Sequence, residues 1–195
     1  MSTPAPRIDG RTARSERTRN AIVDAHVQLV QDGDLRPTAD RIAKLAGVSL
    51  RALWSHFADM EALFAASGQR ILELRDQAYV PVSPDLPLAR RIEAYCRQRA
   101  RLLEQIAPAA RAAALKEPFS PALQLHRKTH LDRVRDEVRM LFAAELNSDH
   151  ELLAALTATS TWPTWGTWRD TMGLDPDAAR AALTRTITAL LRPAR

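Results

Sequence analysis

The sequence has little of what secreted and membrane proteins need. Its one cysteine, Cys96, cannot form a disulfide within the chain, which is typical of a reducing compartment. No apolar run approaches the roughly 18–20 residues of a membrane-spanning helix. The first residues lack the charged-then-apolar pattern of a secretory leader. These absences predict a cytoplasmic protein with no membrane partner.

Signatures of catalysis are also lacking. The sequence has no glycine-rich phosphate loop, no Gly-x-Ser-x-Gly segment and no close pair of carboxylates on a suitable scaffold. We therefore expect no catalytic residue, no cofactor and no metal. His126 and His130 do have the spacing of two ligands to one metal ion. Because two cations and no glutamate lie between them, the pattern favours a solvated or interfacial pair over a metal site.

What the sequence does contain is helical periodicity over most of its 195 residues. Apolar residues make up 46% of the chain, which is enough for a core. We find no strand-like alternation of useful length and no repeat of roughly 20–50 residues. The pattern predicts an all-α protein of about nine helices. A net charge of +5 and a pI of about 10.1 are compatible with a nucleic-acid partner.

The most informative stretch runs from residue 38 to residue 63 and holds two short helical patterns. Thr38 and Ser49 are suited to cap the N-termini of the two helices. Gly47, between the helices, supplies the positive φ of a sharp turn, and the small Ala43 lets the helices cross closely. The residues expected to face inward are Ile42, Leu45, Ala46, Leu53, Trp54 and Phe57. This pattern predicts a helix-turn-helix rather than an ordinary helical hairpin.

The same stretch resembles the N-terminal domain of the TetR family of transcriptional regulators. The segment IAKLAGVS, followed by LRALWSHFADMEAL, follows that family's pattern. The matching positions are Thr38, Ile42, Ala43, Ala46, Gly47, Val48, Ser49, Leu53, His56, Phe57, Glu61 and Leu63. More loosely, the segment WPTWGTWRDTMGLDPDAARAALTRTITALL is similar to the last two helices of the family. The resemblance implies an N-terminal three-helix DNA-binding domain and a C-terminal helical domain for ligand binding and dimerisation.

Four positions depart from the family pattern. Arg51 stands where the family usually has glycine, and Ala52 where it has threonine. Trp54 replaces the usual tyrosine. Met60 replaces a lysine that touches a DNA phosphate in the family. These departures leave the expected fold unchanged and suggest an unusual operator.

We expect three parts in the chain: a flexible basic arm over residues 1–14, a DNA-binding domain over 15–60, and a ligand-binding and dimerisation domain over 61–195. The segment YVPVSPDLP, with three prolines, ends the helix that begins near Asp59. Pro163 is expected to kink a helix that runs to about residue 172. The helices predicted outside the helix-turn-helix cover residues 15–32, 59–78, 86–106, 108–116, 121–146, 149–172 and 176–190.

Position on the helices and the resemblance together give a candidate DNA-binding set. Arg51 lies in the N-terminal turn of the second helix, nearest the base edges, and its guanidinium suits guanine; contact with phosphate alone is the alternative. Thr38 and His56 are expected to hold the DNA backbone. The arginine-rich arm either reaches DNA or is a solvated tail. The full set is Arg17, Thr38, Lys44, Ser49, Leu50, Arg51, Ala52, Trp54 and His56.

The resemblance also implies an unidentified small-molecule effector bound in the C-terminal domain. Arg99 lies on an apolar helical stripe, so it either anchors an acidic ligand or pairs with an internal carboxylate. Trp162, Trp165 and Trp168 either line a cavity at the proline kink or fill the core or a subunit interface. The candidate pocket residues are Tyr95, Arg99, Phe119, Leu123, Val134, Val138 and Trp162.

A homodimer is implied as well, formed by the last two helices. Small and apolar residues on those helices suit a close two-fold contact. The candidate interface residues are Leu156, Ala179, Leu183, Thr186, Ile187 and Leu190.

These features predict a DNA-binding transcriptional regulator, ligand-responsive and acting as a repressor, that binds a near-palindromic operator as a dimer. The alternative from another class is an all-helical ligand carrier or enzyme with a purely structural helix-turn-helix. A third reading is an architectural protein that binds DNA without sequence preference.

Overall fold

The computed structural model describes residues 10–192 and, within them, ten α-helices and no strand. A 3₁₀ turn, η1 (Glu117–Phe119), precedes α6, and a π-helical turn, η2 (Thr167–Thr171), follows α9. The α-helices are α1 (Gly10–Gln31), α2 (Ala39–Leu45), α3 (Leu50–His56), α4 (Met60–Ala78), α5 (Leu88–Ala114), α6 (Pro121–Leu141), α7 (Ala143–Leu146), α8 (His150–Thr159), α9 (Trp162–Gly166) and α10 (Pro176–Leu190). The all-α prediction is confirmed.

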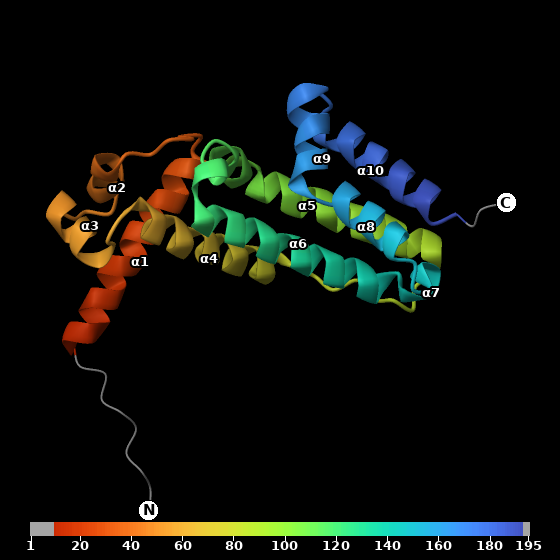
Figure 1. Cartoon of the computed structure of the whole chain (residues 1–195), viewed down its shortest axis with the longest axis horizontal. Helices are drawn as coiled ribbons and strands as arrows, with labels where there is room; N and C mark the ends of the chain where they lie inside the picture. The colour runs from red at the N-terminus through yellow and green to blue at the C-terminus, as the bar shows by residue number, and fades with distance from the viewer. Residues whose placement is uncertain (1–9, 193–195) are drawn as a thin grey trace, which may run out of the picture.

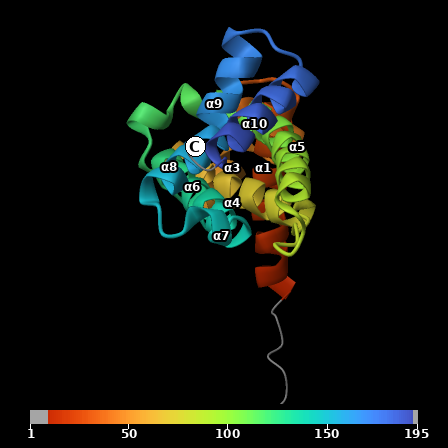
Figure 2. The same ribbon diagram turned by 90° about the vertical axis from the view of Figure 1, so that its right-hand side faces the viewer.

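The helices divide between two hydrophobic cores. Helices α1, α2 and α3 gather at one end of the elongated molecule, and α4 runs from them into a larger bundle (Figure 1). Figure 2 looks along that bundle, in which α5 lies beside α10 and α6 lies beside α4 and α8. The smaller core includes Ile22, Ile42, Leu53 and Leu63. The larger core includes Tyr95, Val134, Phe142, Trp165 and Leu183.

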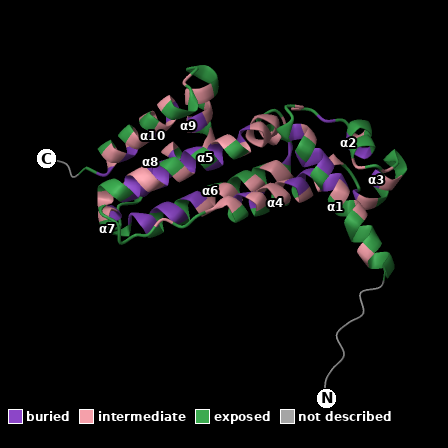
Figure 3. Ribbon diagram, turned by 180° about the vertical axis from the view of Figure 1, so that it is seen from behind, coloured by how far each residue is buried: buried purple, intermediate pink, exposed green. Residues whose placement is uncertain are grey.

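The buried residues form stripes along the facing sides of the helices (Figure 3). Leu63 near the start of α4 belongs to the smaller core, whereas Arg75 near its end pairs with Glu137 of the bundle. Helix α4 therefore connects the helix-turn-helix to the bundle. None of the helices within residues 10–192 combines the length and apolar character that crossing a membrane requires.

Side-chain caps begin several helices, among them the two for which the sequence predicted Thr38 and Ser49. Thr38 accepts a hydrogen bond from the Arg41 amide at 3.4 Å, and Ser49 accepts one from the Ala52 amide at 3.1 Å. Asp59, Asp149 and Asp175 cap α4, α8 and α10 in the same way, with distances of 2.8 Å each. These bonds satisfy amide groups that the first helical turn leaves without partners.

Two predicted boundaries in the first half of the chain are wrong. Helix α1 begins at Gly10 rather than at residue 15, so the end of the expected arm is helical; residues 1–9 of that arm lie outside the described residues. Helix α5 continues through Pro108 to Ala114, where we expected two helices. Proline costs about 3 kcal/mol inside a helix. Burial of Leu103 and Ala107, in the turn that precedes Pro108, offsets part of this cost.

In the second half, two predicted long helices are divided. The helix expected over 121–146 ends at Leu141, and α7 follows after Phe142, which is fully buried. The helix expected over 149–172 becomes α8, α9 and η2. Pro163 does not kink a continuous helix; it lies in the first turn of α9, where its missing N–H costs little.

Helices α4 and α6 approach closely at Gly68. The His126 Nε2 atom lies 2.9 Å from the Ala65 carbonyl oxygen, and the imidazole ring lies against the α4 backbone. A Cβ atom at Gly68 would lie 2.3 Å from His126 Cδ2. Such a contact is far inside van der Waals distance, so this position requires glycine while His126 is present.

We predict that Gly68→Ala destabilises the protein through overpacking, which lowers the free energy of unfolding by about 1–3 kcal/mol. The higher helix propensity of alanine offsets up to about 1 kcal/mol of this loss. Chemical denaturation measures the change. The double variant Gly68→Ala/His126→Ala removes the collision and should recover part of the loss. If the single variant were as stable as the parent, the close approach of α4 and α6 would be wrong.

Candidate nucleic-acid interface and adjoining cavity

The helix-turn-helix is held by a short set of local contacts. Gly47 has φ +69°, and the Val48 amide donates to the Ala43 carbonyl at 3.0 Å, which closes the turn. Ala43 and Leu53 are buried where the helices cross. Arg19 of α1 lies over the Phe57 ring, 4.5 Å from its centroid, and fixes the end of α3. Helix α3 is thus anchored on one face only.

The opposite face of α3 is open to solvent. Arg51 and Trp54 are exposed, Trp54 at 39%. Of the nine candidate DNA-binding residues, Arg17, Thr38, Lys44, Ser49, Leu50, Arg51 and Trp54 are exposed, and Ala52 and His56 are partly exposed. Arg17 comes from α1 and Lys44 from α2, so three helices contribute to this surface.

Two residues expected to face inward do not. Leu45 is 50% exposed, and Trp54 lies on the open face. Ile42 and Ala43 already fill the contact of α2 with the core, so Leu45 is turned outward beside Lys44. Leu45 is therefore an apolar surface residue that the sequence pattern assigned to the core.

A cavity of about 660 Å³ lies next to this domain. Its walls come from α4, the end of α5, α6, and the α8–α9 junction, and most of them are apolar. His26 and Val30 of α1, with Leu35 and Pro37 of the loop before α2, line it as well. The cavity thus contacts both hydrophobic units of the chain. Its volume is within the roughly 300–1,000 Å³ usual for small-molecule sites.

The cavity is not where most of the candidate pocket residues lie. Leu123 and Trp162 line it. Tyr95, Arg99, Val134 and Val138 are instead fully buried in the bundle core, and Phe119 is 88% exposed. Helical periodicity marks residues that face other helices, but it does not distinguish a packed contact from a cavity wall. Trp165 is likewise a core residue, with its Nε1 donating to Glu104 at 2.7 Å.

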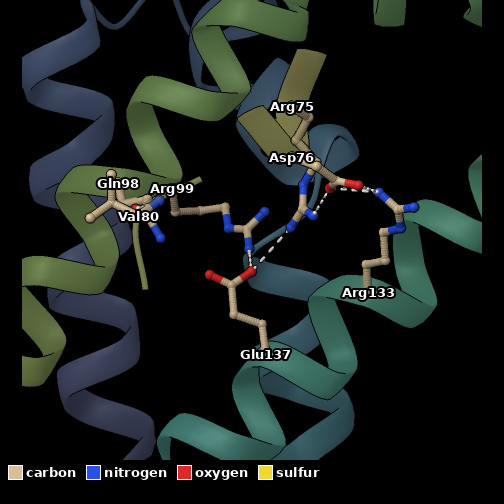
Figure 4. A network of polar contacts seen from close by, with 7 residues as sticks. All are labelled: Arg75, Asp76, Val80, Gln98, Arg99, Arg133 and Glu137. Atoms are coloured by element: carbon tan, nitrogen blue, oxygen red, sulfur yellow. Dashed lines mark hydrogen bonds and ion pairs between the residues drawn. The ribbon is translucent and has the colours of Figure 1, made fainter. Parts of the chain in front are cut away.

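A charge cluster joins α4, α5 and α6 (Figure 4), and its Arg75 lines the cavity. Arg75, Arg99 and Glu137 are buried, whereas Asp76 and Arg133 are partly exposed to solvent. Glu137 of α6 accepts hydrogen bonds through one oxygen, Oε2, from Arg99 of α5 and from Arg75 of α4, the latter at 3.3 Å. Asp76 pairs with Arg133 at 2.6 Å and with Arg75 at 3.1 Å. Arg99 therefore has an internal carboxylate partner, as one of the two sequence interpretations held. Arg75 lines the cavity, but the sequence does not predict it as a pocket residue. An arginine in an amphipathic helix is ordinarily expected at the surface.

Three histidines line the cavity. His26 Nδ1 lies 2.8 Å from the Ser67 hydroxyl, and His126 contacts the α4 backbone. His130 Nε2 has no hydrogen-bond partner. Burial lowers the pKa of both His26 and His130 to about 4; Lys116 adds to the effect on His26, and three arginines add to that on His130. The expected solvated or interfacial pair is therefore a pair of wall residues inside one chain.

Most of the candidate dimer residues are covered by the chain itself. Leu156, Ala179, Leu183 and Ile187 are fully buried against α5 and the rest of the bundle core, so they are unable to touch a partner. Thr186 and Leu190 remain partly exposed. The open face of α10 has Ala181, Arg185 and Ala189 exposed, and Ala178 and Ala182 partly exposed beside Thr186.

A three-helix unit with a helix-turn-helix, joined through α4 to a larger helical domain with a cavity, defines the architecture of one class of DNA-binding regulators. In particular, the chain has the fold of the TetR-family transcriptional regulators. It is similar to a transcriptional regulator from Rhodococcus sp. Rha1, with a TM-score of 0.62 and 22% identity over 91% of this chain and 95% of that one.

Two crystal structures assigned to the TetR family are similar too. The protein from Rhodococcus sp. has a TM-score of 0.60 and 18% identity, over 91% of this chain and 100% of that one. The protein from Mesorhizobium loti has a TM-score of 0.59 and 16% identity, over 91% and 96% of the two chains. Neither the family models nor the curated proteins compared with the sequence give a match.

The buried histidines predict a loss of stability in mild acid. Because the folded pKa of His26 and of His130 is about 4, against an ordinary 6.5, the unfolded chain binds more protons between these values. The stability that the two neutral histidines contribute to the folded state is fully present above pH 6.5. It is lost as the pH falls towards 4. Between about pH 7 and pH 5 we expect the free energy of unfolding to fall by about 1–2 kcal/mol for each histidine.

Denaturation by urea at the two pH values measures this dependence. His130→Leu should reduce it, because the variant lacks the imidazole whose pKa burial lowers. An unaltered pH dependence in His130→Leu would show that this histidine is not buried in its neutral form.

Proposed function

We propose that the chain is a DNA-binding transcriptional regulator of the TetR type, which acts as a ligand-responsive repressor and binds a near-palindromic operator as a homodimer. The observation that carries the proposal is the open face of α3. Its N-terminal turn presents Arg51 to solvent while Leu53 and Phe57 fix the helix from behind. A helix held in this way fits the major groove with its first turn towards the bases.

Each exposed side chain has a role suited to its chemistry. Arg51 donates to O6 and N7 of a guanine, and Leu50 and Trp54 offer apolar contact to thymine methyl groups. Arg17 and Lys44 neutralise phosphates. The hydroxyl groups of Thr38 and Ser49 accept the capping bonds, and each retains its hydrogen for a phosphate oxygen. His56 at the end of α3 holds the backbone, and Ala52 leaves room for close approach.

The cavity supplies a reason for ligand response. A molecule in it contacts α1 and the loop before α2, as well as α4 and the bundle. Any difference in the position of α1 between the DNA-bound and free states therefore changes the fit of the ligand. Effectors commonly couple to a second site by about 1–3 kcal/mol. Binding that favours the free state lowers the affinity for the operator and releases repression.

The dimer is proposed on the exposed face of α10 rather than on its buried stripe. Ala178, Ala182 and Thr186 follow one another at helical spacing, and alanines 181 and 189 flank them. Small side chains allow two copies to approach closely around a two-fold axis, and a two-fold dimer matches the symmetry of a palindromic operator.

Selection of bound sequences from a random DNA pool tests the proposal, with Arg51→Ala as the decisive variant. The parent should recover two half-sites in inverted orientation. Loss of the bidentate contact should cost about 1–3 kcal/mol and relax the preference at one base pair in each half-site. His56→Ala should weaken binding to all sequences about equally.

Arg139→Ala is the matched control, because this exposed arginine lies on α6 and pairs with Asp136. If Arg51→Ala lowered the affinity for every sequence alike, Arg51 would contact phosphate only. If the parent selected no sequence, the helix-turn-helix would be structural, and a helical ligand carrier would explain the cavity.

A second prediction concerns the dimer. Sedimentation at micromolar concentration should give about twice the chain mass of 21.7 kDa. Ala182→Arg places a long charged side chain on the open face of α10 and should give monomers that bind the operator weakly. Ala89→Arg, an exposed position at the start of α5, should leave the dimer intact. A parent chain that sediments as a monomer and still binds its operator tightly would contradict the proposed dimer.

A further inference from the structure

We propose that the cavity binds a small amphipathic molecule with a single carboxylate, which lies at Arg75 and His130 while the apolar body fills the rest. This inference rests on the proposed function, because it states the chemical class of the effector. It follows from the charges, the unpaired polar atoms and the composition of the cavity walls.

The charge cluster beside the cavity has more positive than negative groups. Its buried part, Arg75 and Arg99 against the single carboxylate of Glu137, has one surplus positive charge. Asp76 and Arg133, which pair with each other, are 48% and 33% exposed. Arg75 is 6% exposed and Arg99 is 1% exposed. The rings of Tyr79 and Tyr95 lie 5.6 Å and 5.5 Å from the two guanidinium groups and offset part of the charge. A buried charge without a full counter-charge is costly, so one additional anion is favoured at this place.

Two residues that line the cavity each have one buried nitrogen without a partner. Arg75 Nε and His130 Nε2 are both buried, and neither makes a hydrogen bond. Both residues line the cavity, and Arg75 lies at its bundle side with its guanidinium between Glu137 and Asp76 (Figure 4). An oxygen anion there accepts a bond from Arg75 Nε–H. The neutral imidazole of His130 donates a second bond when its proton is on Nε2. Two donors and one surplus positive charge suit a carboxylate.

The remaining wall residues do not suit a cationic ligand. Glu117 is the one acidic residue among the described residues that line the cavity, and it pairs with Arg127 at 2.8 Å. Because Arg127 already pairs with Glu117, no carboxylate among the described wall residues is free to receive a cationic ligand, and Lys116 and Lys128 add further positive charge. Between these groups the walls are apolar, with Val30, Leu72, Ile106, Leu123 and Trp162 among them. An apolar body with one acidic end fits this distribution.

A series of ligands with different head groups, titrated into the full-length protein without DNA, tests the inference. Isothermal titration calorimetry near neutral pH compares dodecanoate, dodecan-1-ol and dodecyltrimethylammonium, which share one apolar chain. Charge-assisted hydrogen bonds predict that dodecanoate binds at least about tenfold more tightly than the other two. If dodecanoate does not bind, or binds no more tightly than the alcohol or the cation, the inference is overturned.

Variants locate the carboxylate. Arg75→Met and His130→Leu keep most of the side-chain volume, and each should weaken dodecanoate about tenfold while leaving dodecan-1-ol unchanged. Arg133→Met is the matched control, because Arg133 belongs to the same cluster but does not line the cavity. If Arg75→Met fails to fold, His130→Leu decides, since it removes no partner from Glu137. Equal weakening of the acid and the alcohol would refute a carboxylate at these residues.

The ligand titration and the DNA selection that tests the proposed function can fail independently. Dodecanoate binding is measured on free protein, so it does not depend on operator recognition. A chain that binds dodecanoate as predicted but selects no DNA would retain the ligand site and refute the regulator. A chain that selects an operator but prefers the alcohol would refute the carboxylate and retain the regulator.

Discussion

The arrangement of the larger bundle depends on one shared carboxylate. Glu137 of α6 receives Arg99 from α5 and Arg75 from α4, so three helices meet at a single oxygen atom. All three side chains are buried, and removal of one leaves a buried charge with one partner fewer. Such a loss typically costs about 3–5 kcal/mol, whereas the intact group stabilises little beyond an apolar replacement. What the group does provide is position, because Glu137 Oε2 joins α6 to α5 and to α4 at one point.

The position of α4 connects this cluster to the helix-turn-helix. Leu63 at one end of α4 is packed with Ile42 and Leu53, while Arg75 at the other end is held by Glu137. A rigid helix of this kind transmits a small displacement at one end to the other. The cavity lies along the same helix and also touches α1. In the proposed regulator, a ligand therefore acts on the helix-turn-helix through packed atoms, without an intervening flexible linker.

The helix-turn-helix and the larger bundle depend on contacts of different sequence range. In residues 38–57 the caps and the turn glycine are neighbours in sequence, and each makes its bond within a few residues. In the bundle the decisive contacts join distant residues: Arg99 meets Glu137, and Trp165 meets Glu104. Local capping bonds form whatever surrounds the helix. Long-range contacts depend on the packing of every helix between the partners.

The amino-acid sequence by itself determined the helix-turn-helix, the helix caps and the all-α class, because those follow from turn chemistry and from helical periodicity within a few residues. Only the tertiary structure decided which apolar stripe faces a cavity and which is packed solid. Tyr95 and Val138 have the same spacing as wall residues but lie in the core, and the stripe of α10 is covered by its own chain rather than by a partner. Periodicity tells which face of a helix is apolar; what covers that face depends on where the other helices lie.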